Sequence, residues 1–123
     1  MQSLRSRQGQ WAWMLHRLTG LGVLVFLCLH IVDTSMMLAG EEAYNHYIKL
    51  VYQQWWFQPM EVGLGAALLF HALNGLRIIL MDFWDQGIRY ERQLRYGAIG
   101  LFVVTMVPLT VVMLWPFVVR ALA

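Results

Sequence analysis

The stretch Phe70–Asp85, FHALNGLRIILMDFWD, is apolar enough to lie in a bilayer and yet contains His71, Asn74, Arg77 and Asp82. On a helix, His71 and Asp82 lie within roughly 20° of one line and about 16 Å apart along the axis. Polar groups at membrane depth are costly, and they usually mark a cofactor, an ion path or a buried partner. The stretch therefore predicts a membrane helix with a functional face.

Composition places the rest of the chain in the same class. The 123 residues are 59% hydrophobic and 13% charged, whereas a soluble domain is about half apolar and about a quarter charged. Six Trp suit a bilayer interface. The cations flank apolar segments and form no patch, so we expect no nucleic acid partner. The single Cys28 permits no disulfide within the chain.

Three segments are long enough to span a bilayer, which predicts an all-α membrane protein. They cover about residues 13–38, 59–84 and 95–119. We expect residues 1–12 to form a cytoplasmic N-terminal arm and 13–123 a three-helix transmembrane domain. The segment at about 41–57 has helical spacing and is predicted to lie in the outer interface. Pro108 should kink the third helix.

The distribution of Lys and Arg predicts the orientation. Seven of these cations lie in the N-terminal arm, at the start of the first helix, or around the connection between the second and third helices. The seven are Arg5, Arg7, Arg17, Arg77, Arg89, Arg92 and Arg95; the other two are Lys49 and Arg120. The positive-inside rule then places the N-terminus in the cytoplasm and the C-terminus outside, in a multi-pass protein of the inner (plasma) membrane.

Two histidines in the first helix are candidate site residues. His16 and Arg17 lie where that helix enters the membrane, beside the small Thr19 and Gly20, which let a helix or ligand approach closely. On the residues alone, an anchoring role at the headgroups is equally open. His30, two heptads later, is either a metal or heme ligand or a histidine that is hydrogen-bonded in the bundle or faces the headgroups.

The second helix offers His71 near mid-membrane. Gly75, one turn later, should leave room for a flat macrocycle beside the helix. From the residues alone, a heme ligand and a hydrogen-bonded core histidine stay equally open. If Arg17 and Asp82 share one level at the cytoplasmic side, His71 lies about 16 Å deep and His30 about 20 Å deep.

Two motifs carry a resemblance to a known family. HRLTG at 16–20, followed by HALNGLRIILMDFWD from His71, resembles the cytochrome b membrane-anchor subunit of succinate dehydrogenase, complex II. That family has three helices, an H-R-x-(S/T)-G entry to the first and an H-x-x-x-G-(I/L)-R-x-x-x-x-D pattern in the second. The spacing matches at each position, and the resemblance spans roughly Trp11–Trp84.

The resemblance implies roles for individual residues. His71 matches the axial ligand of heme b, while His16 and Arg17 match positions near a heme propionate and the quinone site. Asp82 matches an acidic residue at the cytoplasmic end, near the quinone site and the iron–sulfur subunit. Better-known members carry a quinone-contacting Ser where this chain has Trp13, so an indole is expected to line the pocket instead.

The resemblance also implies partners and cofactors. A second small membrane-anchor subunit would supply the other imidazole of heme b and complete the bundle, of which this chain forms half. His30 is then either a ligand of a second heme or the partner of His71 on one heme. Flavoprotein and iron–sulfur subunits would dock on the cytoplasmic face with FAD and iron–sulfur clusters. This chain lacks motifs for either, so it cannot oxidise succinate alone.

Other functions remain open at this stage. The same parts would serve a fumarate reductase anchor that runs in reverse. A heme-free structural anchor would use His71 for packing. A transporter or channel subunit would use His71, Arg77 and Asp82 as a proton path.

Overall fold

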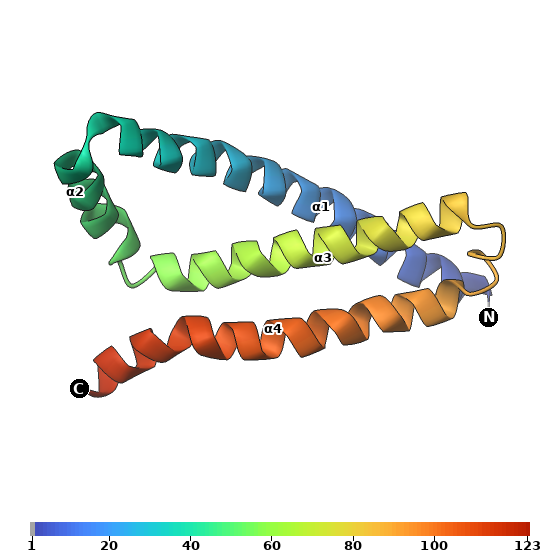
Figure 1. Cartoon of the computed structure of the whole chain (residues 1–123). Coiled ribbons are helices and arrows are strands. Elements are labelled where there is room, and N and C mark those ends of the chain that lie inside the picture. The colour runs from blue at the N-terminus through green and yellow to red at the C-terminus, as the bar shows by residue number, and fades with distance from the viewer. Residues whose placement is uncertain (1) are drawn as a thin grey trace.

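The computed structural model describes residues 2–123, with side chains from residue 9 onward, and every regular element in that range is helical. This confirms the predicted all-α class. The elements are α1 (Gln2–Ser35), the short 3₁₀ helix η1 (Met36–Ala39), α2 (Glu41–Tyr52), α3 (Phe57–Phe83) and α4 (Glu91–Leu122) (Figure 1).

Three helical stretches are long and apolar enough to cross a membrane, as predicted. They are Gly9–Ala39, Phe57–Phe83 and Glu91–Leu122. The ends of α3 lie close to those predicted, but α1 begins at Gln2 rather than near residue 13. The described residues of the predicted arm thus form the first turns of α1, because this segment lacks proline and is rich in helix-forming Gln, Leu and Arg.

The three long helices form a layer with α3 in the middle. Both α1 and α4 pack on α3, and in the described chain they do not pack on each other. α1 crosses α3 in its N-terminal half and then diverges from it, so that α2 closes the wide end of the layer (Figure 1). α4 runs unbroken through Pro108 and Pro116 and curves in its C-terminal part, since each proline removes one backbone hydrogen bond.

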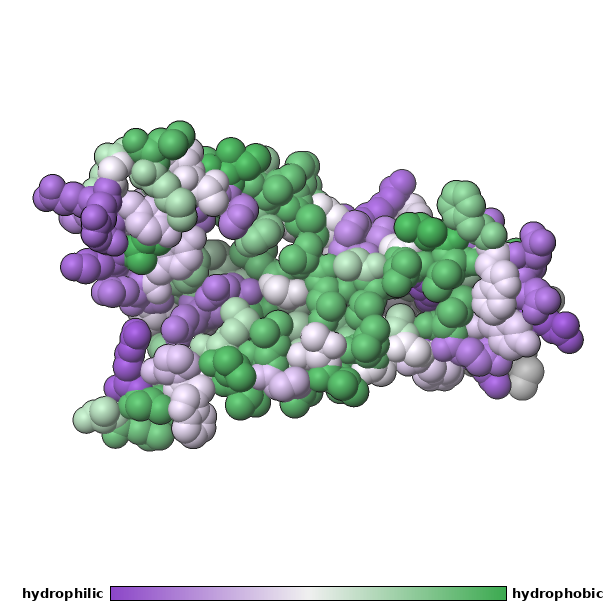
Figure 2. Space-filling model, viewed as in Figure 1, coloured by the Kyte–Doolittle hydropathy of each residue, from purple (hydrophilic) through white to green (hydrophobic). Residues whose placement is uncertain are grey.

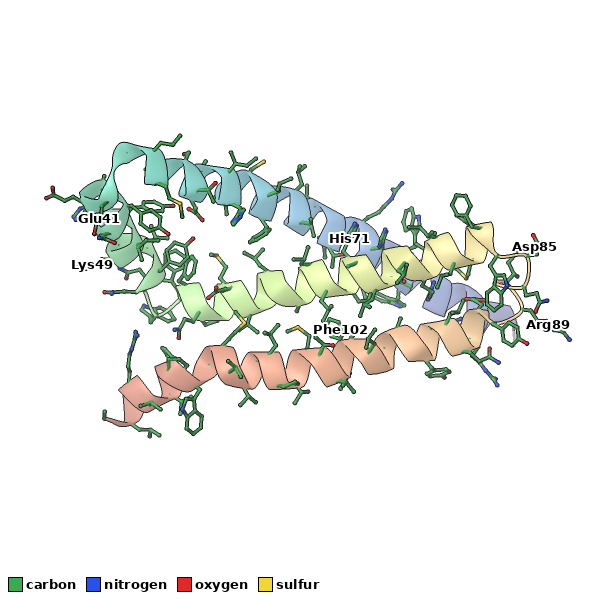
Figure 3. All side chains as sticks on the ribbon, in the orientation of Figure 1. Glu41, Lys49, His71, Asp85, Arg89 and Phe102 are labelled. Carbon is green, nitrogen blue, oxygen red and sulfur yellow. The ribbon has the colours of Figure 1, made fainter. Side chains whose placement is uncertain are left out.

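The surface of the chain is mostly apolar. Met106 is the one buried hydrophobic residue in the described part, at 8% exposure. In Figure 2 the middle of the molecule is predominantly hydrophobic, and hydrophilic residues gather at its two ends. Figure 3 places Glu41 and Lys49 at one end and Asp85 and Arg89 at the other. This banding suits a bilayer whose lipids cover the middle.

Candidate functional site

The crossing of α1 and α3 brings His16 and His71 together. Their rings stack with centroids 4.2 Å apart and planes 7° apart, and His71 lies between the two helices in Figure 3. A Cβ on Gly20 would lie 3.0 Å from His71 Cε1, and a Cβ on Gly75 would lie 3.6 Å from His16 Cε1. Each helix thus contributes a histidine and a glycine four residues later, and each histidine packs on the glycine of the other helix.

This arrangement confirms one expectation and corrects another. Gly20 does allow close approach, and the group that approaches is the ring of His71. The space beside Gly75, however, is not open for a macrocycle, because the ring of His16 occupies it.

The stack also corrects the expected depths. His16 lies level with His71, not with Asp82, since their rings are in contact. His30 follows His16 by fourteen residues on the same helix, which puts it about 21 Å further along α1. The interpretation in which His30 and His71 share one heme iron is therefore wrong, because two axial ligands of one iron lie only a few ångströms from it.

Hydrogen bonds fix the tautomer of His71. Its Nδ1 lies 3.1 Å from the carbonyl oxygen of His16 and 3.4 Å from Thr19 Oγ1. A carbonyl oxygen can only accept, so Nδ1 carries the hydrogen and donates it. In a neutral imidazole the lone pair is then on Nε2, which forms no hydrogen bond with the described residues and is not enclosed. Metal-binding histidines commonly donate their other ring N–H to a backbone carbonyl in this way.

His16 has a polar atom that the chain leaves without a partner. Its Nδ1 is buried and forms no hydrogen bond among the described residues. Leaving a buried polar atom unsatisfied costs about 1–3 kcal/mol. A polar group from a bound cofactor or a partner subunit would remove that cost.

Arg17 and Trp13 form a second pair on α1. The guanidinium carbon of Arg17 lies 4.2 Å from the centroid of the Trp13 ring, a cation–π contact. Both side chains are exposed, Trp13 to 59%. Asp82 is also exposed and, in the described structure, forms no ion pair with Arg17. The structure therefore joins Trp13 to Arg17 and leaves Asp82 apart from them.

His30 lies on an exposed part of α1. Its ring stacks on Phe26, one turn earlier, with centroids 5.5 Å apart. The residues that the structure describes contain no group of three or more His, Cys, Asp or Glu that could hold a bare metal ion. A heme iron needs only axial ligands from the protein, so single histidines such as His30 and His71 suffice.

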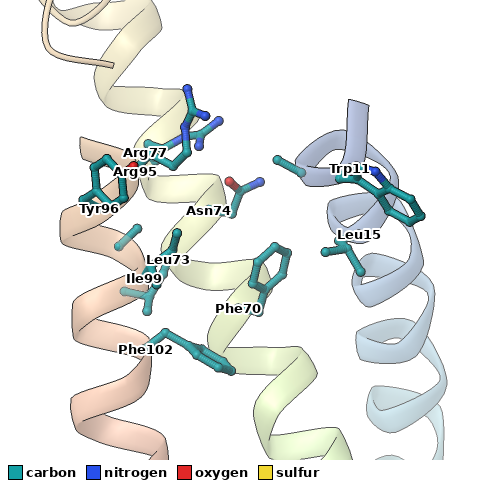
Figure 4. A pocket seen from close by; sticks show the side chains of 12 residues that line it. Trp11, Leu15, Phe70, Leu73, Asn74, Arg77, Arg95, Tyr96, Ile99 and Phe102 are labelled. Atoms are coloured by element: carbon teal, nitrogen blue, oxygen red, sulfur yellow. The ribbon is translucent and has the colours of Figure 1, made fainter. Parts of the chain in front are cut away.

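The structure contains a cavity between α1, α3 and α4 that the sequence did not predict (Figure 4). It has a volume of about 440 Å³, and Asn74, Arg77 and Arg95 line it. Asn74 is 6% exposed. Its three-residue spacing from Arg77 shows that the two share a face of α3, but apolar residues surround this helix on every side. The sequence therefore did not reveal which face meets α4.

Comparisons with known proteins agree with the motifs. The sequence model of the family described as succinate dehydrogenase/fumarate reductase transmembrane subunit matches residues 1–114. The chain is 41% identical over 108 residues to the succinate dehydrogenase 2 membrane subunit SdhC of Mycobacterium tuberculosis. The aligned segment covers 88% of this chain and 79% of the relative.

Two archaeal relatives are more distant. The succinate dehydrogenase hydrophobic membrane anchor subunit of Halobacterium salinarum is 33% identical over 81% of this chain and 78% of its own length. The subunit of the same description from Archaeoglobus fulgidus is 33% identical over 67% of this chain and 69% of its own length.

Proposed function

Because the chain belongs to the succinate dehydrogenase/fumarate reductase transmembrane subunit family, we propose that it anchors a succinate:quinone oxidoreductase and binds heme b through Nε2 of His71. The observation that carries this proposal is the hydrogen bond from Nδ1 of His71 to the carbonyl oxygen of His16. It holds the imidazole in the one neutral tautomer whose Nε2 can bind iron.

The residues around His71 would then support the cofactor. When bound, heme b would supply a one-electron carrier between the iron–sulfur subunit and the quinone. His16 holds the ring of His71 by stacking, and the unpartnered Nδ1 of His16 suits a hydrogen bond to the heme or to the second anchor subunit. That second subunit would cover the open side of the layer and supply a second imidazole for the heme.

The quinone site would lie at the cytoplasmic side, next to the iron–sulfur subunit. Arg17 would donate hydrogen bonds to a quinone carbonyl, and its charge would stabilise the negative charge that reduction places on that oxygen. Trp13, already stacked on Arg17, would supply a flat apolar wall for the quinone ring. Asp82 would contribute at the edge facing the iron–sulfur subunit. Succinate oxidation itself would take place in the flavoprotein, and fumarate reduction would use the same route in reverse.

His30 would be the ligand of a second heme. The separation of about 21 Å along α1 leaves room for two macrocycles, one near each side of the membrane. The exposed position of His30 suits a heme held between this chain and the second anchor subunit.

Heme content of the purified complex tests these assignments. We expect His71→Ala to lose about one heme per complex in a pyridine-hemochrome assay, and His30→Ala to lose a different one. His46→Ala is the matched control, because His46 is exposed on α2 and should leave heme content unchanged. A full heme complement in His71→Ala would refute the ligand assignment, and one in His30→Ala would refute the second heme.

One observation favours a heme-free structural anchor as the second candidate. The stacked rings of His16 and His71 fill the crossing of α1 and α3 by themselves, so the pair already serves packing. A purified four-subunit complex without a Soret band would select this candidate.

A further inference from the structure

Neither of the stacked histidines lines the cavity between α1, α3 and α4. We propose that it binds an anionic phospholipid, with the lipid phosphate at Arg77 and one acyl chain along the apolar walls. This proposal does not rest on heme or quinone binding at the α1–α3 crossing. The cavity volume of about 440 Å³ falls within the roughly 300–1,000 Å³ that small-molecule binding sites occupy.

The polar end of the cavity contains a buried donor without an acceptor. Asn74 is 6% exposed, projects from α3 towards α1 in Figure 4, and its amide forms no hydrogen bond within the part of the chain that the structure describes. Arg77 follows one turn later, and its Nε is buried without a partner there. The buried Nε of Arg77 requires an acceptor that the described residues do not supply, and the amide of Asn74 is a second polar group at this end of the cavity that can bind a ligand.

The charge at this end indicates an anion. The guanidinium groups of Arg77 and Arg95 lie side by side in Figure 4 and line the same cavity. Arg95 is paired with Glu91, with Nη2 2.7 Å from Oε1, whereas Arg77 forms no ion pair among the described side chains. A phosphodiester beside Arg77 would accept hydrogen bonds from its guanidinium, and its negative charge would offset the repulsion between Arg77 and Arg95.

The apolar end continues in the direction of the membrane interior. Phe70 and Leu73 of α3 face Ile99 and Phe102 of α4 there, and the rings of Phe70 and Phe102 meet edge to face at 6.3 Å. This lining offers an acyl chain an apolar path that begins at the charged end.

Two aromatic residues set the depth of the charged end. Trp11 and Tyr96 line the cavity and are 60% and 68% exposed. Such amphipathic rings concentrate at the headgroup level of a bilayer. The guanidiniums of the cavity therefore lie where lipid phosphates lie, which favours a phospholipid over a quinone: a quinone is neutral and needs no second cation.

Binding of defined lipids to the intact complex tests the proposal. The purified, delipidated complex is titrated with dioleoyl phosphatidylglycerol and, separately, with dioleoyl phosphatidylcholine, and bound lipid is counted by native mass spectrometry. We expect at least about a tenfold preference for the anionic lipid at the tightest site, and about a tenfold loss of that preference in Arg77→Gln. Arg92→Gln removes an exposed cation from the first turns of α4 and should change nothing.

A second pair of variants keeps the test valid if Arg77→Gln fails to assemble. Asn74→Leu replaces the amide by an apolar side chain with the same branching and the same number of non-hydrogen atoms. Phe102→Trp fills the apolar end while keeping both guanidiniums, and each variant should weaken binding of the anionic lipid several-fold. Equal affinity for the two lipids would overturn the proposal, as would wild-type binding in Asn74→Leu and Phe102→Trp. A quinone that displaces the anionic lipid from wild type, but has no effect on Phe102→Trp, would overturn it in favour of a quinone site.

Discussion

Two glycines determine how closely α1 and α3 approach. The fit is tight at Gly20, where a Cβ would lie 3.0 Å from His71 Cε1, whereas a Cβ on Gly75 would make an ordinary contact of 3.6 Å with His16 Cε1. Small residues have this role in many membrane helix pairs, because lipid gives helices little hydrophobic reason to associate. Here they bring the carbonyl oxygen of His16 within hydrogen-bonding distance of the His71 imidazole, so the packing of the two helices also orients that ring.

Gly20→Ala should therefore disturb His71 directly. The added Cβ forces the ring to move by a few tenths of an ångström, which strains the 3.1 Å bond from Nδ1 to the His16 carbonyl. We expect a destabilisation of about 1–3 kcal/mol, measured as a lower midpoint of thermal unfolding of the purified complex, together with a shifted reduced heme band.

Gly22→Ala is the control for that substitution. Gly22 is on the same helix, but its added Cβ would lie 3.9 Å from the Cβ of Ala67, an ordinary contact. If Gly20→Ala unfolds at the same temperature as Gly22→Ala and shows the same reduced heme band, the tight fit at Gly20 does not contribute to stability.

At the scale of elements, α2 is held to the end of α1 by one carboxylate. The hydroxyl groups of Tyr47 and Tyr52 both donate to Asp33, Tyr52 to Oδ2 at 2.7 Å. Gly40, with φ at 100°, makes the turn that brings α2 back towards α1. Asp33 is thus the residue that attaches the amphipathic helix α2 to the end of the spanning helix α1.

Removing the two phenol hydroxyls should loosen α2. In Tyr47→Phe/Tyr52→Phe the rings remain, but Asp33 loses both of the hydroxyl groups that donate to it. We expect amide exchange across residues 41–52 to accelerate at least about tenfold. Tyr44→Phe, whose hydroxyl has no hydrogen bond in the described structure, should leave exchange unchanged; equal acceleration in both variants would contradict the role of Asp33.

The same contacts predict a pH dependence above neutrality. Burial, and then the hydrogen bond to Asp33, raises the pKa of Tyr52, while the hydrogen bond to Asp33 is the main cause that raises the pKa of Tyr47. A raised pKa in the folded state stabilises the docked form fully below the unfolded value of about 10, and this stabilisation is lost as the pH rises through the folded value.

Protection of α2 from amide exchange, corrected for the intrinsic rate, should thus stay constant between about pH 7 and 9 and fall only above about pH 10. Ultraviolet absorbance of phenolate should show two late-ionising tyrosines that are missing from Tyr47→Phe/Tyr52→Phe. Complete ionisation of all tyrosines with ordinary pKa values would contradict these contacts.

At the scale of the whole molecule, the sequence was sufficient for the spans and insufficient for their pairing. Hydropathy and length located three helices and gave the ends of α3 closely, because lipid admits only long apolar helices. Motif spacing selected His16 and His71. Their mutual contact was not predicted, since α1 begins at Gln2 and its register against α3 is set by the fit of histidines on glycines, which periodicity does not report.

The cavity was not predicted either, because its residues come from helices that are far apart in the sequence. Asn74 and Arg77 lie on α3, but the site exists only because α4 presents Arg95 and Phe102 to them. An amphipathic pattern would have indicated the facing side in a soluble bundle. Lipid or another helix covers α3 on all sides, so its pattern of apolar residues does not indicate which side faces α4.

The excess of seven cations over two predicts the orientation of the whole layer in the membrane. Single cysteines in a Cys28→Ser background, at Gln10 and at Ala123, place a probe at each end of the layer. A membrane-impermeant maleimide should label Ala123→Cys in intact cells and Gln10→Cys only after permeabilisation, because the positive-inside rule keeps the Arg-rich end in the cytoplasm.

Glu42→Cys supplies the internal check on that experiment. Glu42 is exposed on α2 and follows Glu41, which Figure 3 places at the end of the layer opposite Asp85 and Arg89. It must therefore be labelled together with Ala123 if three helices cross the membrane. Labelling of Gln10→Cys in intact cells, with protection of the other two, would invert the topology. It would also place Arg17, Trp13 and Asp82 on the outer side, where docking of the soluble subunits on the cytoplasmic face could no longer bring electrons to them.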